Sequence, residues 1–368
     1  MISPQQLKNE ASGIVSKYAK SSNTKGFIQI ANTLIPYTLL FYLALKSTTD
    51  YYWYTPALIF LLALFIVRVF MIMHDCGHNS LFQTPLLNKI FGFITGVIVG
   101  MPQYVWAQHH NFHHSTNGNW SKYRGPLSTL SIDEYRRLSP RKQKIYRYTR
   151  NILFAPIGAF MYFIFNPRFN WLLGSIKYIY HVLDRKIRNW HTPIQTISEK
   201  YHSRHWANSR QYWHMFANNI VLISLWVILS NTFGAAEFFS VYIISLSIAG
   251  AAGIIIFTIQ HNFDSSYASD DEHWNYYKAA LDGTSFLDFP VIANWFSADI
   301  AYHHIHHLSA RIPNYNLARC HKEYSSWFNG VTRIRLQDIP DAFKYILWDT
   351  SALKIISVKQ FEQQALVR

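Results

Sequence analysis

Histidines recur at helical spacing in three short stretches of this sequence, HDCGH, HHNFHH and HHIHHL. Residues three and four apart lie on one face of a helix, so each stretch can direct two or three imidazoles toward one point. The histidines with this spacing are His74 and His78, then His110, His113 and His114, and then His303, His306 and His307. Because imidazole binds both zinc and iron, the pattern predicts a metal site.

The remaining histidines divide into three kinds. His261 stands alone, but it directly follows an apolar run and its place indicates a further ligand. His109 and His304 each have a histidine three or four residues on, and we expect them to orient or protonate the ligands rather than to bind metal. The others are interpreted as ordinary surface or core residues: His181, His191, His202, His205, His214, His273 and His321.

The composition indicates a membrane protein with a large polar part. Half of the 368 residues are hydrophobic and 17% are aromatic, while only 15% are charged. Ordinary globular chains carry about 25% charged residues. Two isolated cysteines, Cys76 and Cys320, exclude a disulfide framework and any site built on a CxxC motif.

Four apolar runs have the length of about 20 residues that a helix needs to cross a bilayer. These predicted spans are residues 27–45, 54–73, 216–233 and 238–259. Short turns join the first to the second and the third to the fourth, so the fold class is an all-α membrane protein with four transmembrane helices in two hairpins. Two shorter apolar stretches are expected to form interfacial helices that lie flat or re-enter the membrane: residues 90–101 and 152–165.

The spans also bring the histidines together. Two spans separate the first histidine stretch from the third, so all of them return to one membrane face, in a helical cap formed by residues 74–214 and 260–330. With His261, nine imidazoles converge there. Nine exceed the four ligands of one tetrahedral zinc and suit two metal ions.

The basic residues predict the orientation. The net charge is +14, yet the two short turns hold only Lys46, so both termini and the cap are expected to be cytoplasmic. On this basis the chain divides into a cytoplasmic N-terminal segment (1–26), a main domain (27–330) and a cytoplasmic C-terminal tail (331–368). The basic run at residues 141–150 is interpreted as a surface facing solvent or lipid headgroups, and no nucleic acid partner is expected.

The histidine stretches resemble the three histidine boxes of the membrane fatty acid desaturases. The boxes here are HDCGH, HNFHH and HIHH. Four longer stretches are similar to the bacterial acyl-lipid branch of that family: WAQHHNFHHSTNGNW, IQHNFDSSY, EHWNYYKAALDGTSFLDFP and AYHHIHHLSARIPNYNL. The resemblance runs from Asn23 through Asn316.

The resemblance implies a cytoplasmic di-iron site in a bacterial inner-membrane enzyme. The two irons would be held by the nine histidines, including His261, with O2 as co-substrate. Relatives have an asparagine four residues before that histidine, which contacts iron through water, and here the position is Phe257. Ligand histidines also need acceptors for their second ring nitrogen, and Asp75, Asp264 and Asp299 are candidates because they lie near ligands in sequence.

The resulting hypothesis is an oxygen-dependent desaturase that introduces a cis double bond into phospholipid acyl chains. No dinucleotide, flavin or haem motif is present, so electrons must come from an external ferredoxin, flavodoxin or cytochrome. A hydroxylase or ketolase acting on an alkane, a carotenoid or a sphingolipid is the alternative, because it begins with the same hydrogen abstraction. A membrane metal transporter is the remote alternative; such proteins place ionisable groups near the bilayer midplane, where here only Arg68 lies.

Overall fold

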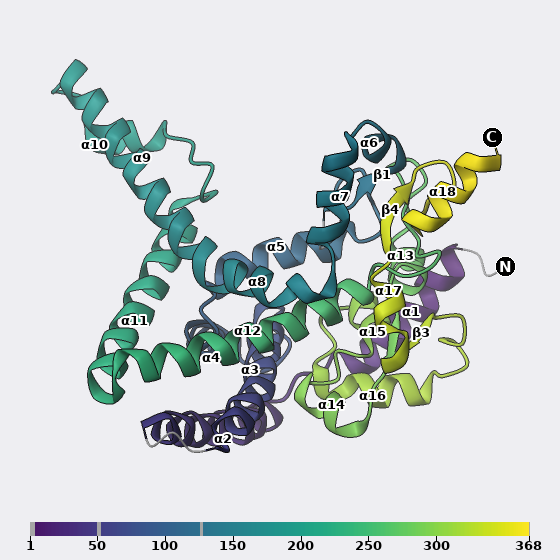
Figure 1. The fold of residues 1–368 in the computed structure, drawn as a ribbon, viewed down its shortest axis with the longest axis horizontal. Coiled ribbons are helices and arrows are strands. Elements are labelled where there is room, and N and C mark those ends of the chain that lie inside the picture. The colour runs from purple at the N-terminus through teal and green to yellow at the C-terminus, as the bar shows by residue number, and fades with distance from the viewer. Residues whose placement is uncertain (1–3, 50–52, 126–127, 368) are drawn as a thin grey trace.

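A computed structural model of the chain describes residues 4–49, 53–125 and 128–367. The chain is mostly helical, with two small sheets at one end (Figure 1). The α-helices are α1 (Pro4–Tyr18), α2 (Asn23–Thr49), α3 (Thr55–Gly77), α4 (Pro85–Ile98), α5 (Gln103–Thr116), α6 (Ile132–Arg136), α7 (Pro140–Thr149), α8 (Ala155–Phe160), α9 (Asn166–Arg188), α10 (Ile194–Glu199), α11 (Ser209–Phe233), α12 (Ala235–Ile259), α13 (Tyr276–Asp282), α14 (Val291–Phe296), α15 (His303–Leu308), α16 (Asn314–Glu323), α17 (Ile339–Ala342) and α18 (Val358–Val367). Three short helical segments of other types are η1 (Ile152–Phe154), η2 (Met161–Phe165) and η3 (Leu336–Asp338).

Helices long and apolar enough to cross a membrane include all four predicted spans, which lie within α2, α3, α11 and α12. A glycine makes the second hairpin possible: Gly234 joins α11 to α12 with φ +95°, a conformation that side chains with a Cβ rarely adopt. The helical membrane fold expected from the sequence is therefore confirmed.

The number of long apolar helices differs from the prediction. Residues 152–188 form one nearly continuous helical path of 37 residues, which passes the same test of length and composition and makes a fifth candidate. The apolar run ends where Asn166, Pro167 and Arg168 follow it, yet a helix accepts proline in its first turn and α9 continues to Arg188. The bent pair α4 and α5, which meet at 102°, would make a sixth if it counts as one span.

The core of the membrane part surrounds α3. This helix packs against α2, α4 and α12, and α12 packs in turn along α8. Its one charged residue before the histidines, Arg68, is buried: its Nε donates a hydrogen bond to Thr33 Oγ1 at 3.0 Å, and its guanidinium donates to the carbonyl of Trp295. The charge thus ties two membrane helices to α14 rather than facing lipid.

The C-terminal residues are part of the cap rather than a separate tail. The described residues form the strands β1 (Leu130–Ser131), β2 (Phe286–Asp288), β3 (Arg333–Arg335), β4 (Tyr345–Asp349) and β5 (Lys354–Ser357). β4 pairs in parallel with β1 and antiparallel with β5, while β3 pairs in parallel with β2. The predicted boundary after residue 330 therefore cuts through both sheets, and the cap is not purely helical.

Candidate metal centre and cavity

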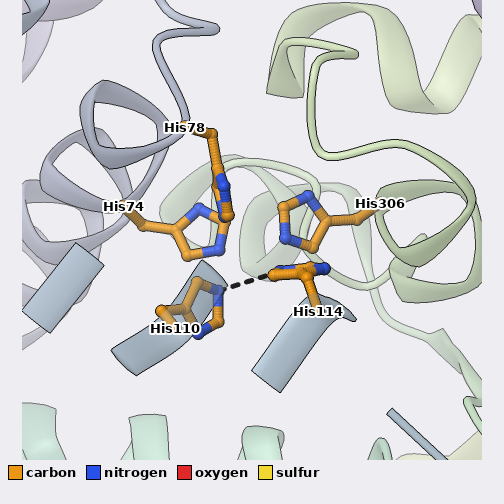
Figure 2. Close-up of side chains that lie close together, drawn as sticks. All are labelled: His74, His78, His110, His114 and His306. Atoms are coloured by element: carbon orange, nitrogen blue, oxygen red, sulfur yellow. Dashed lines mark hydrogen bonds between the residues drawn. The ribbon is translucent and has the colours of Figure 1, made fainter. Parts of the chain in front are cut away.

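Five histidines form the first group at the junction of α3, α5 and α15. Within the described residues, one ring nitrogen of each lies within 4.8 Å of the others. Figure 2 shows their rings facing a common space, with Nε2 of His110 and Nε2 of His114 3.1 Å apart. The members of this group are His74, His78, His110, His114 and His306.

Four more histidines form the second group, which adjoins the first. Its members are His113, His261, His303 and His307. The Nε2 atoms of His261 and His303 are 2.9 Å apart, and those of His113 and His307 are 3.2 Å apart. The ring centres of His114 and His307 lie 4.2 Å apart, so the two groups are in contact. The helices α5 and α15 each contribute histidines to both groups.

Local sequence explains how the rings reach these positions. The spacing of three and four residues places His110, His113 and His114 on one side of α5, and α15 is a single short helix whose histidines are all buried. His74 lies in the last turn of α3 and His261 just after α12, so two membrane helices end at the site. The structure thus brings together all nine histidines that the sequence singled out.

Burial keeps the imidazoles that follow the fourth predicted membrane span in sequence neutral. It lowers the pKa of His261 to about 3. Burial also holds the pKa values of His303, His306 and His307 well below the usual range, and neighbouring histidines of the cluster lower these three further. Neutral imidazole is the form that binds a metal.

Two unpaired ring nitrogen atoms test whether these residues fit a metal ion. Nε2 of His78 and Nε2 of His306 are buried and have no hydrogen-bond partner among the described residues. A buried nitrogen without a partner costs on the order of 1 to 3 kcal/mol. Since both atoms belong to the first group, a metal ion would satisfy them, and the donor set fits a metal that accepts imidazole. The two groups can therefore hold metal.

Two contacts orient the imidazole rings of His74 and His261. Nδ1 of His74 lies 3.0 Å from a carboxylate oxygen of Asp75, whose other oxygen accepts a hydrogen bond from the backbone N–H of Asn314 at 2.9 Å. Nδ1 of His261 lies 3.3 Å from the carbonyl oxygen of Gly283. Asp75 was predicted as such a partner. The backbone carbonyl of Gly283 could not be predicted, because every residue has a carbonyl group and the sequence does not show which one faces a ring.

The other two aspartate candidates lie away from the rings. Asp264 is exposed and contacts Ser265 and Gln360. Asp299 is half-buried in the turn before α15, and burial raises its pKa to about 6 against an opposing effect of nearby Arg68. In the described part of the chain, neither carboxylate forms a hydrogen bond or ion pair with a histidine of the two groups.

The two ambiguous histidines have different surroundings. His109 is exposed to the space beside the site and lines its cavity. His304 points away from both groups, and its Nε2 lies 3.0 Å from Nδ1 of His321. His321 was interpreted as an ordinary residue, and its ring stacks on Phe286 at 4.7 Å.

One aromatic residue beside the centre was not predicted. The buried ring of Trp106 stacks on His110, with ring centres 4.5 Å apart and an angle of 18° between the planes. It lies four residues before His110 on the same face of α5, and this helical spacing was the available signal.

A cavity of about 500 Å³ runs from the histidines into the membrane part. It touches the first group at His74 and His110 and the second at His113 and His303. Its walls come mainly from α3, α5 and α12, with smaller parts from α8 and η2, and are largely aliphatic and aromatic away from the histidines. A long apolar space thus ends at both candidate metal groups.

Phe257, the departure from the family pattern, lines the cavity beside the histidine rings. Its ring centre is 5.1 Å from that of His113 and 5.2 Å from that of His261. Since phenylalanine offers no ligand atom, this position forms an apolar wall and contributes nothing to metal coordination.

Together these features define a helical membrane protein whose histidine-rich metal centre closes one end of an apolar cavity. A family model described as "Fatty acid desaturase" matches residues 51–328. The chain is 31% identical over 346 residues to a fatty acid desaturase of Bacillus subtilis (strain 168), covering 94% of this chain and 89% of the relative.

Plant proteins are more distantly similar. The Delta(12) fatty acid desaturase DES8.11 of Calendula officinalis is 25% identical over 295 residues, with 79% of this chain and 70% of the relative covered. The acyl-lipid omega-3 desaturase (cytochrome b5) of the endoplasmic reticulum of Arabidopsis thaliana is 25% identical over 253 residues, with 68% and 58% covered.

The chain therefore belongs to the fatty acid desaturase family, as the histidine boxes indicated. It is a membrane enzyme of a family that acts on lipid acyl chains.

Proposed function

We propose that the chain is an oxygen-dependent acyl-lipid desaturase that introduces a cis double bond into phospholipid acyl chains at a di-iron centre. The observation that carries the proposal is the cavity, because its apolar walls lead to histidines of both groups. An apolar chain gains about 0.8 kcal/mol for each methylene that it buries in such a space. The substrate would thus lie with its methylene groups against the metal centre.

The nine clustered histidines would hold the two iron ions, five in the first group and four in the second. Bound iron supplies the oxidising power that no side chain has, since removal of hydrogen from an unactivated methylene requires activated dioxygen. Overall, two hydrogens leave adjacent carbons of the acyl chain, two electrons and two protons come from outside, and O2 is reduced to two waters.

The protein's own part is to bind, orient and exclude water. Buried neutral imidazoles are prepared to bind metal without first losing a proton. Asp75 and the Gly283 carbonyl fix the rings of His74 and His261. The apolar cavity walls, including Phe257, keep water from the reacting carbons.

Electrons would come from an external ferredoxin, flavodoxin or cytochrome. The formal charge of +14 favours an acidic carrier at the surface of the cap. We place the protein in a bacterial inner membrane with both termini and the cap on the cytoplasmic side, because the first and last predicted hairpin turns hold only Lys46 among basic residues.

The test is expression of the full chain, with a bacterial ferredoxin and its reductase, in a desaturase-deficient bacterium. Phospholipid acyl chains are then profiled by gas chromatography–mass spectrometry with and without oxygen. The His306→Ala variant removes a member of the first group. His273→Ala is the matched control, because His273 is exposed and its ring pairs with Asp270 outside both groups.

New cis-unsaturated chains are expected from the wild type and the His273→Ala variant in oxygen, and none from the His306→Ala variant or without oxygen. A hydroxylated chain would instead identify a hydroxylase on the same scaffold. Unchanged lipids with the folded, iron-loaded protein and its reduced carrier present would contradict the proposal.

A further inference from the structure

The wall that α12 gives to the cavity contains one position with free space in front of it. The cavity-lining residues of this helix and its C-terminal cap follow helical spacing: Leu246, Ala249, Gly250, Gly253, Ile254, Ile256, Phe257 and Gln260. A Cβ built on Gly253 meets no atom within 4 Å. Because this residue lines the cavity, a side chain there would project into the space itself.

The neighbouring glycine on the same wall serves another purpose. A Cβ on Gly250 would lie 2.6 Å from the Cβ of Ala159 and 3.0 Å from the ring of Phe163. Gly250 is therefore small so that α12 can pack closely against α8, with which its contact is extensive, and against Phe163. No such contact requires a glycine at position 253.

The depth of Gly253 in the cavity follows from helix geometry. It lies four residues before Phe257, which is about 6 Å along the axis at about 1.5 Å per residue. Leu246 lies seven residues further from the histidines, about 10 Å deeper along the axis. Gly253 thus divides the cavity into a part beside the metal centre and a part beyond it.

The deeper part is suited to the free end of an acyl chain. Its α12 wall includes Leu246 and Ala249, which are apolar and lie in the middle of this membrane helix. An ester or phosphate group would lose its hydration there without polar partners, at a cost of several kcal/mol, whereas a terminal methyl group loses nothing. The headgroup end must therefore remain near the cap.

We infer that Gly253 is a specificity-determining residue that sets the length of acyl chain accepted beyond the reacting carbons. This inference rests on the proposed function and adds to it the length of acyl chain that the cavity accepts. The absent side chain keeps the deep part of the cavity open, so that long acyl chains fit with their methyl ends below Gly253. A large side chain at this position would close the deep part and exclude the long chains.

The test compares the full-length wild type with the Gly253→Ala and Gly253→Leu variants in a host whose phospholipids contain acyl chains of several lengths. The fraction of each chain length converted, and the position of its double bond, are measured by gas chromatography–mass spectrometry. Gly13→Leu is the matched control, because Gly13 is also helical, is exposed, and has no atom within 4 Å of a built Cβ.

Each methylene that no longer fits in an apolar pocket changes selectivity by about tenfold or more. The Gly253→Leu variant should therefore convert the longest chains at least about tenfold less, relative to the shortest, than the wild type does. The alanine variant should shift the ratio in the same direction by less, and the Gly13→Leu variant should not shift it.

An unchanged ratio of long to short products in the Gly253→Leu variant would overturn the inference. If that variant does not accumulate as folded protein, the alanine variant and a Gly253→Val variant provide the test, and an unchanged ratio in both overturns it equally. A wild type that produces no double bond at all would contradict the proposed function instead, so the two failures are distinguishable.

Discussion

The Nε2 atoms of His261 and His303 lie 2.9 Å apart, although 42 residues separate them in the chain. His261 follows the last membrane helix, α12, and His303 begins the short helix α15 in the cap. Both rings are buried, and burial lowers the pKa of each, so two neutral rings face one another. The second histidine group therefore depends on how the segment between them is held against the membrane helices.

Replacement of Asp75 should weaken the first group. Its carboxylate contacts Nδ1 of His74 and accepts a hydrogen bond from the backbone of Asn314, so the Asp75→Ala variant would free the ring. Loss of such an orienting partner typically lowers metal affinity or activity by about 10- to 100-fold. Iron retained by the purified protein during dialysis against a chelator measures the effect.

Asp264→Ala is the control for that experiment, because this aspartate is also close to a histidine in sequence but is exposed and contacts no ring. Iron retention in this variant should equal that of the wild type. Equal retention in the Asp75 and Asp264 variants would contradict the role assigned to Asp75.

Arg68 should contribute to the position of α14. Its Nε donates to Thr33, and its guanidinium carbon lies 3.9 Å from the ring centre of Trp295. The Arg68→Met variant should lose on the order of 2 kcal/mol of stability, since it removes hydrogen bonds of a charged group. Arg68→Lys should recover only part of this, because lysine lacks the planar fork.

The measurement is the temperature at which the detergent-solubilised protein loses its monodisperse peak in size-exclusion chromatography. The Thr33→Val variant isolates one of the hydrogen bonds and should lower that temperature by less than Arg68→Met does. A midpoint for Arg68→Met equal to that of the wild type would show that the buried charge does not hold α14.

Asp299 should make the stability depend on pH. Burial raises its folded-state pKa to about 6, while the unfolded chain has a value of about 4. Between about pH 4 and pH 6 the folded state keeps a proton that the unfolded state has lost, so this group's contribution to stability falls as pH rises through that window.

The Asp299→Asn variant should remove this effect. Asparagine also tolerates the positive φ of 56° at this position. The variant should be more stable than the wild type at pH 7.5 by on the order of 2 kcal/mol, with a smaller difference at pH 5. Unfolding midpoints at the two pH values provide the measurement, and a difference that grows toward low pH would contradict the sign.

Removal of residues 331–368 should unfold the cap. Ile334 packs in one core cluster with Leu287 and Ala301, and the backbone of Ile346 accepts a hydrogen bond from Tyr146 at 2.6 Å. The truncated chain is expected to aggregate on extraction, while the milder Ile334→Ala variant should lose about 2 to 5 kcal/mol. A monodisperse truncated protein with full iron content would contradict this.

The sequence was most informative where chemistry and helical spacing coincide. His110, His113 and His114 could be placed on one face because α5 is a regular helix, and His261 could be placed because α12 ends beside it. The membrane helices α3 and α12 could be predicted from their apolar runs, because a helix needs about 20 apolar residues to cross a bilayer.

The pairing of short strands that are far apart in the chain could not be predicted from the sequence. β1 is two residues long and pairs with β4 more than 200 residues later, so neither has a period that identifies its partner. Aspartates close to ligands in sequence were equally plausible candidates, and only tertiary structure separates buried Asp75 from exposed Asp264. The cavity, which is made by several elements, has no linear signature.

The iron-to-protein ratio of the purified, full-length chain tests the central claim most directly. Elemental analysis of the wild type should give about two iron ions per chain, because two separate groups of histidines are present. The His306→Ala and His307→Ala variants remove one member of each group and should both fall below that ratio. A wild type that holds no iron, or variants that hold as much as the wild type, would contradict a di-iron centre built from these nine residues.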